Sequence, residues 1–122
     1  MIDRRGSSAP LDPIEQLSPT EARERHQSGS LLLDVRTPAE WAAGHAPNTT
    51  WIPLDELEQR FGELDPNVSV VAICRVGGRS QAAADFLSSR GLHAANLAGG
   101  MMAWEADGLD VIDDEGGPGA IL

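Results

Sequence analysis

Apolar and polar residues alternate in blocks along the middle of the chain, in a pattern typical of strands followed by helices. The clearest helix is predicted over residues 54–64, where four apolar side chains recur at helical spacing and share one face. Residues 68–73 form the most apolar run, which predicts a strand buried on both faces. Strands alternating with helices predict an α/β fold with a mostly parallel sheet covered on both sides.

Local signals predict where the other elements begin and end. Ser18, Pro19 and Glu21 form a capping-box pattern, so a helix should start there and run to about Gln27. The other predicted strands cover residues 14–17, 31–35, 51–52 and 93–97, and the other predicted helices cover residues 38–44, 80–90 and 101–106.

The two ends of the chain differ from this patterned middle. Residues 1–12 are polar and contain several Gly, Ser and Pro, so we expect a flexible arm. Residues 113–122 are acidic and rich in glycine, and we expect a flexible tail there. One folded domain is therefore predicted at residues 13–112.

The composition excludes several classes of function. The chain has 122 residues, of which 41% are apolar, and a formal net charge of −10. Such a charge argues against a nucleic-acid partner, which needs a basic face, and against docking on an anionic membrane. No apolar run approaches ~18 residues, so no membrane span is predicted. A single cysteine cannot form an internal disulfide, and we expect a cytoplasmic protein.

That single cysteine, Cys74, lies at the carboxyl end of the most apolar predicted strand. Ligand sites of open α/β sheets lie at this edge of the sheet. Gly77 and Gly78 allow a tight turn, and the following helix directs its free N–H groups toward the same point. Because helix N-termini and cationic neighbours favour the thiolate, Cys74 is the candidate nucleophile.

Charge around the cysteine supports this interpretation. No acidic residue occurs in the window 66–84, whereas Arg75 and Arg79 both fall inside it. We expect both guanidinium groups to help hold an anion. Ser80 has two possible roles: a hydroxyl donor to the sulfur or, as we favour, the N-cap of the helix. The predicted loop around Cys74 consists of Arg75, Val76, Gly77, Gly78, Arg79 and Ser80.

The length of this loop discriminates between chemistries. Cys74 and Arg79 are separated by four residues, whereas cysteine-dependent phosphatases use a spacing of five. Removing one residue shortens the loop by at most ~3.6 Å. The smaller ring suits one additional sulfur atom better than a phosphoryl group.

Three separated segments of the chain resemble the rhodanese family of sulfurtransferases. These are CRVGGRSQAAADFLSSRG around the cysteine, LLLDVRTPAEWAAGHAPNTTWIPL before it and NLAGGMMAWEADGLDV after it. The resemblance spans about residues 14–112 and implies a three-layer rhodanese-like fold with a five-stranded, mostly parallel sheet.

The resemblance also implies an activity. A Cys74 thiolate would take a sulfur atom from a small anionic donor such as thiosulfate, form a persulfide, and pass the sulfur to an acceptor. The acceptor could be a protein thiol or a sulfur carrier, and no cofactor is implied. Two alternatives remain: a non-catalytic protein-binding module, and a cysteine-dependent phosphatase or arsenate reductase.

Other conspicuous residues are interpreted as structural. Asp34 and Arg36 should form an ion pair near the same sheet edge, with Glu40 as another possible partner of Arg36. His45 is predicted to be a hydrogen-bonding loop residue. His26 and His93 have no partners at ligand spacing, so no metal site is predicted. Trp41, Trp51 and Trp104 are predicted to be core residues.

Overall fold

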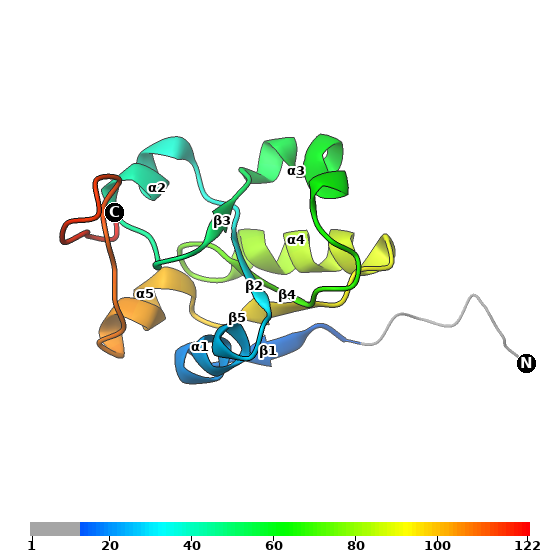
Figure 1. Ribbon diagram of the computed structural model, residues 1–122, viewed down its shortest axis with the longest axis horizontal. Helices are drawn as coiled ribbons and strands as arrows, with labels where there is room; N and C mark the ends of the chain where they lie inside the picture. Colours follow the sequence, from blue (N-terminus) through cyan, green and yellow to red (C-terminus); the bar gives the residue numbers. More distant parts are fainter. Residues whose placement is uncertain (1–12) are drawn as a thin grey trace, which may run out of the picture.

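A parallel five-stranded sheet organises residues 13–122, the part of the chain that the computed structural model describes (Figure 1). The strand order is β1-β5-β4-β2-β3, and all four neighbouring pairs are parallel. The predicted arm lies outside the described residues. The strands are β1 (Glu15–Leu17), β2 (Leu31–Asp34), β3 (Thr50–Trp51), β4 (Val70–Ile73) and β5 (Ala94–Leu97).

Helices cover both faces of this sheet. In Figure 1, α3 and α4 lie on one side of the strands, and α1 and α5 lie on the other. The predicted three-layer α/β architecture is therefore confirmed. Within the described part of the chain, every helix is too short or too polar to traverse a lipid bilayer. The helices are α1 (Pro19–Gln27), α2 (Pro38–Ala43), α3 (Leu54–Arg60), α4 (Gly78–Ser89) and α5 (Gly100–Ala106), with one 3-10 turn, η1 (Phe61–Glu63).

The central strand β4 contributes to two separate apolar clusters. Val70 and Ala72 pack on the side of α3 and α4, whereas Val71 and Ile73 pack on the side of α1 and α5. Successive side chains of a strand point to opposite faces, so a strand covered on both faces must be apolar throughout. All four residues of β4 are buried, as the continuous apolar run predicts.

Helix boundaries follow the local capping chemistry. The capping box at Ser18 is confirmed: the Glu21 N–H donates to the Ser18 hydroxyl over 3.1 Å, and the Glu21 carboxylate accepts from the Ser18 N–H over 2.9 Å. By contrast, α4 begins at Gly78, two residues earlier than predicted. Gly77 precedes it with a φ of 113°, a conformation that favours glycine, and this turns the chain directly into the helix.

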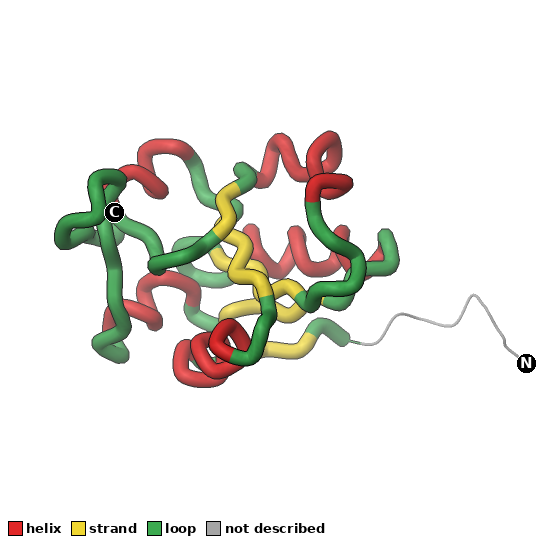
Figure 2. The backbone as a smooth tube through the Cα atoms, in the orientation of Figure 1, coloured by secondary structure: helices red, strands yellow, loops and turns green. Residues whose placement is uncertain are grey.

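The acidic tail differs from the predicted flexible segment because it packs against α2 (Figure 2). The N–H groups of Asp114 and Ala120 donate to the carbonyls of Ala42 and Ala43 at the end of α2. A helix leaves its last carbonyl groups without intrahelical partners, and the tail provides donors for two of them. The polar composition of the tail gave no indication of this long-range pairing.

Candidate active site

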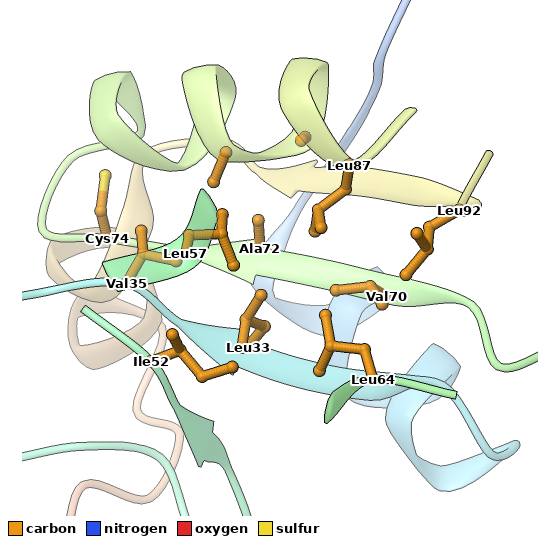
Figure 3. Close-up of a cluster of buried hydrophobic side chains, with 12 residues drawn as sticks. Leu33, Val35, Ile52, Leu57, Leu64, Val70, Ala72, Cys74, Leu87 and Leu92 are labelled. Atoms are coloured by element: carbon orange, nitrogen blue, oxygen red, sulfur yellow. The ribbon is translucent and has the colours of Figure 1, made fainter. Parts of the chain in front are cut away.

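Cys74 follows β4 directly and is buried, with 1% of its surface exposed. Its side chain belongs to the apolar cluster beneath α4, and Figure 3 shows its sulfur atom pointing toward the first turn of that helix. The sulfur therefore has an apolar base on one side. On the other side it faces the loop that connects β4 to α4.

That loop directs hydrogen-bond donors at the sulfur. The Gly77 N–H donates to Cys74 Sγ over 3.0 Å, and the Ser80 hydroxyl lies 3.2 Å from the same atom. Gly77 itself has a left-handed backbone conformation, which favours glycine at this position of the loop. Cys74, Gly77 and Ser80 thus meet at the sulfur, and their roles as site residues stay a prediction.

These donors decide the ionisation of Cys74. Burial is the largest single influence and raises the pKa of the thiol. The hydrogen bond from the Ser80 hydroxyl and those from the backbone N–H groups of Ser80, Gly77 and Val76 lower it. Together these hydrogen bonds outweigh burial, so the pKa of Cys74 lies below its usual range. Because the thiolate is the nucleophilic form of cysteine, the site favours attack by sulfur.

The two arginines of the loop are placed differently from the prediction. Arg75 donates from Nε to the backbone oxygen of Leu122, and Arg79 donates two hydrogen bonds to the carboxylate of Glu40. Neither guanidinium group forms a hydrogen bond to Cys74 Sγ in the described structure. Backbone N–H groups and the Ser80 hydroxyl make the contacts with sulfur, while the charge of Arg79 interacts with Cys74 without a hydrogen bond.

The favoured role of Ser80 as N-cap is wrong. Gly77 occupies the N-cap position, and Ser80 lies inside the first turn of α4, fully buried. Its hydroxyl instead faces Cys74 Sγ, which is the other role that the sequence left open. The early start of α4 is the physical reason, because it places residue 80 in the helix and directs its side chain at the sheet edge.

Glu40 binds Arg79 rather than Arg36. The pairing spans 39 positions in the sequence, with contacts of 2.8 and 2.9 Å. Hydrogen bonds from Arg79, assisted by those from Thr37, lower the pKa of Glu40 to about 2. The pair therefore ties the last arginine of the Cys74 loop to the start of α2.

We expect a Glu40→Gln variant to lose the acid sensitivity that this pair creates. A carboxyl group whose pKa is lowered on folding stabilises the protein above its unfolded pKa of 4.5, and this contribution disappears as pH falls toward about 2. Since 37% of the Arg79 side chain is exposed, solvent screening limits the difference to about 1 kcal/mol. The measurement is the free energy of unfolding in urea at several pH values between 6 and 2.

Glu56→Gln provides a matched control, because Glu56 also pairs with an arginine but 48% of its side chain is exposed. Its pH profile should follow the wild type closely. If the free energy of unfolding depends on pH in the same way in the wild type and in Glu40→Gln, the pair of Glu40 and Arg79 does not cause the acid sensitivity.

The predicted ion pair between Asp34 and Arg36 is present and fully buried. Arg36 Nε and Nη2 contact both carboxylate oxygens over 2.7–3.1 Å, and Nη2 also donates to the Gly44 carbonyl over 2.7 Å. The guanidinium group therefore joins the end of β2 to the end of α2. This is a structural role at the edge of the sheet.

The aromatic residues near this edge form a stack. The ring centroids of Trp41 and His45 are 3.6 Å apart, those of Trp41 and Trp51 are 5.5 Å apart, and the rings of each pair are nearly parallel. Trp104 is a core residue as predicted, but Trp41 and Trp51 are only half-buried. His45 Nδ1 lies 2.7 Å from the Trp41 carbonyl, consistent with the predicted hydrogen-bonding role.

The start of α5 supports the Cys74 loop from behind. The N–H groups of Met101 and Met102 donate to the carbonyls of Cys74 and Arg75 over 2.8 and 3.0 Å. A Cβ atom at Gly100 would collide with the backbone of the same two loop residues. Glycine at this position therefore allows α5 to approach the loop and fix its first two peptide groups.

Asn96 is a site residue that the sequence analysis missed. It lies on β5, is almost fully buried, and its Oδ1 lies 2.6 Å from the Ser80 hydroxyl. One signal was available, since Asn96 is the polar residue in the otherwise apolar strand segment AANL. Nothing local indicated which element it would face.

No group of three or more His, Cys, Asp or Glu side chains within residues 13–122 is arranged to hold a metal ion. The described chemistry of the site consists of one sulfur, several N–H groups, one hydroxyl and two nearby arginines. This is an α/β domain that presents a single ionisable cysteine at the carboxyl edge of its parallel sheet.

Comparison with known proteins agrees with this description. Residues 18–107 match the family model described as a rhodanese-like domain, and the chain therefore belongs to the rhodanese-like family. A sulfurtransferase from Allochromatium vinosum is 39% identical over 87 residues, which cover 70% of this chain and 81% of that protein.

Solved structures show the same fold. A rhodanese-related protein from Thermoplasma volcanium has a TM-score of 0.76 and 32% identity, covering 80% of this chain and 97% of its own. A rhodanese-like domain protein from Staphylococcus aureus has a TM-score of 0.70 and 29% identity, covering 75% of this chain and 91% of its own.

Proposed function

We propose that this protein is a sulfurtransferase that carries sulfur as a persulfide on Cys74. The observation that carries the proposal is the sulfur itself, which is buried at the sheet edge and bound by the Gly77 N–H and the Ser80 hydroxyl. The lowered pKa of Cys74 increases the fraction of thiolate, which is the nucleophile that the reaction needs. Membership of the rhodanese-like family and similarity to a named sulfurtransferase support the same activity.

In the first half-reaction, the Cys74 thiolate attacks the outer sulfur of a donor such as thiosulfate. A bond forms between Sγ and that sulfur, and the sulfur–sulfur bond of the donor breaks. Sulfite leaves with the electron pair of the broken bond. Positive potential from Arg75, Arg79 and the start of α4 stabilises the anions that enter and leave.

In the second half-reaction, a nucleophilic acceptor attacks the terminal sulfur of the persulfide. Cyanide would leave as thiocyanate, and a protein thiolate would itself become a persulfide. In both cases the electron pair of the breaking bond returns to Cys74 as a thiolate. The protein is then ready for another donor, and no redox cofactor is needed to balance the cycle.

Intact mass spectrometry tests the proposal directly. Incubation with thiosulfate should add the mass of one sulfur atom at Cys74, and subsequent cyanide should remove it and produce thiocyanate. Turnover of an aryl phosphate without any sulfur gain would instead support the phosphatase. If the protein neither gains sulfur from thiosulfate nor hydrolyses the aryl phosphate, the result would support a non-catalytic binding module.

Exposed apolar side chains around the loop favour a protein as the acceptor. Within residues 13–122, the large apolar side chains classed as exposed are Val76, Met102 and Leu122. Val76 belongs to the Cys74 loop, the Met102 N–H donates to the Arg75 carbonyl, and the Leu122 backbone oxygen accepts a hydrogen bond from Arg75 Nε. We infer that these three residues, here called the apolar rim, contact a protein segment that presents its thiol between apolar residues.

A Met102→Gln variant should separate acceptor binding from sulfur chemistry. Glutamine keeps the length of the side chain but removes part of its apolar surface. Transfer to a synthetic peptide that carries Leu-Cys-Leu should fall roughly fivefold relative to transfer to cyanide. The measurement is the ratio of the two second-order rate constants, and an unchanged ratio would argue against contact with the apolar rim.

A further inference from the structure

One hydroxyl proton lies between two acceptors beside the candidate nucleophile. Ser80 Oγ is 3.2 Å from Cys74 Sγ and 2.6 Å from Asn96 Oδ1. A serine hydroxyl carries a single proton and can donate one strong hydrogen bond at a time. The two contacts therefore cannot both be donated by Ser80.

The orientation of Asn96 makes its oxygen the atom that faces Ser80. Its Nδ2 lies 3.2 Å from the Gly77 carbonyl, 2.8 Å from Gln16 Oε1 and 3.3 Å from Gln81 Oε1. A backbone carbonyl can only accept, so the atom beside Gly77 must be the amide nitrogen. Asn96 Oδ1 is left facing Ser80, its hydrogen-bond donor among the described residues.

The direction of these hydrogen bonds depends on the charge of Cys74. While Cys74 is a thiol, its S–H can donate to Ser80 Oγ, and the hydroxyl can donate onward to Asn96. When Cys74 loses its proton, that chain of donors is broken at the sulfur. The hydroxyl must then turn to the thiolate, and Asn96 Oδ1 becomes a buried acceptor without a donor, which is unfavourable.

We propose that Asn96 is a positioning residue that competes with the Cys74 sulfur for the single proton of Ser80. The competition opposes ionisation, because the thiolate gains the hydroxyl only when Asn96 loses it. This rests on the proposed function, in which the Cys74 thiolate attacks the donor. The nucleophilicity of a thiolate falls as its pKa falls. By keeping the pKa of Cys74 higher than it would be without this competition, Asn96 makes the thiolate a stronger nucleophile.

Two substitutions at Asn96 should shift the pKa of Cys74 in opposite directions. Asn96→Ala removes the competing acceptor, so the Ser80 hydroxyl can donate to the thiolate without leaving a buried acceptor unpaired. The pKa of Cys74 should therefore fall by about one unit. Asn96→Asp places an anionic acceptor beside Ser80, so the pKa should rise by about one unit. The Gly77 carbonyl keeps its hydrogen bond from the Gln81 N–H in both variants.

The pKa can be followed by the ultraviolet absorbance of the thiolate as a function of pH. The chain contains one cysteine and no tyrosine, so this signal reports Cys74 without interference from phenolate groups. No sulfur donor or acceptor is present in the measurement. If the proposed function is wrong, thiosulfate will add no sulfur to Cys74 in the intact-mass experiment. That result is separate from the titration, which tests only whether Asn96 affects the pKa of Cys74.

A second comparison tests whether Ser80 transmits the effect. In a Ser80→Ala background, Asn96→Ala should no longer lower the pKa, because there is no hydroxyl to release. Shifts of the same sign in Asn96→Ala and Asn96→Asp, or a full shift that persists without Ser80, would overturn the proposal. If Asn96→Ala fails to fold, a pKa in Asn96→Asp that does not rise would overturn it equally.

Discussion

A Cys74→Ser variant should lose sulfur transfer from thiosulfate to cyanide by about 1,000-fold or more. The hydroxyl of serine is far less acidic than a thiol, so the hydrogen bonds that favour a thiolate cannot generate an equivalent nucleophile at neutral pH. Without the sulfur of Cys74 no persulfide can form, so the variant loses the whole reaction path and not only one of the interactions that accelerate it. The measurements are the rate of thiocyanate formation and the intact mass after thiosulfate treatment.

Ser80→Ala is the matched control for this variant. It keeps the sulfur and removes one of its donors, so thiosulfate should still add one sulfur atom to the protein. Circular dichroism and thermal unfolding should show that both variants fold, since each exchange conserves the small size of its side chain. Sulfur transfer retained by Cys74→Ser would exclude the persulfide mechanism.

Replacing Arg36 with Met should destabilise the protein by about 3–5 kcal/mol. The side chains of Arg36 and Asp34 are both fully buried, so the substitution leaves a carboxylate in the interior without its counter-ion. The Gly44 carbonyl loses its donor as well. The free energy of unfolding, measured in urea at neutral pH, checks the prediction.

Removing both charges should be much less harmful than removing one. A double Asp34→Leu and Arg36→Met variant has no unpaired charge to bury, so it should regain at least half of the lost stability. Arg36 Nη1 is also a buried donor without a partner in the described part of the chain, and its removal eliminates that cost. A double variant no more stable than Arg36→Met alone would contradict this interpretation.

The elements of the fold were predictable wherever local chemistry defines them. The capping box at Ser18 satisfies helix donors within three residues, and the apolar run of β4 has to be covered on both faces. The cysteine, glycine and serine that meet at the site lie within seven consecutive residues. Their proximity follows from a short turn between a strand and a helix.

Details of those same elements were not predictable. Whether α4 would begin at residue 78 or 80 depended on the backbone conformation of Gly77, and this decided whether Ser80 capped the helix or faced the sulfur. Either outcome satisfies the local preferences of serine. The sequence alone therefore left both roles open.

By itself, the amino-acid sequence determined the alternation of strands and helices and the placement of one cysteine after the central strand. Tertiary structure decided which distant groups meet: Glu40 with Arg79, Asn96 with Ser80, and the tail with the end of α2. The reason is that capping, turns and apolar periodicity act over a few residues. Pairing of buried polar groups depends on which strands and helices become neighbours, and only the assembled sheet establishes that order.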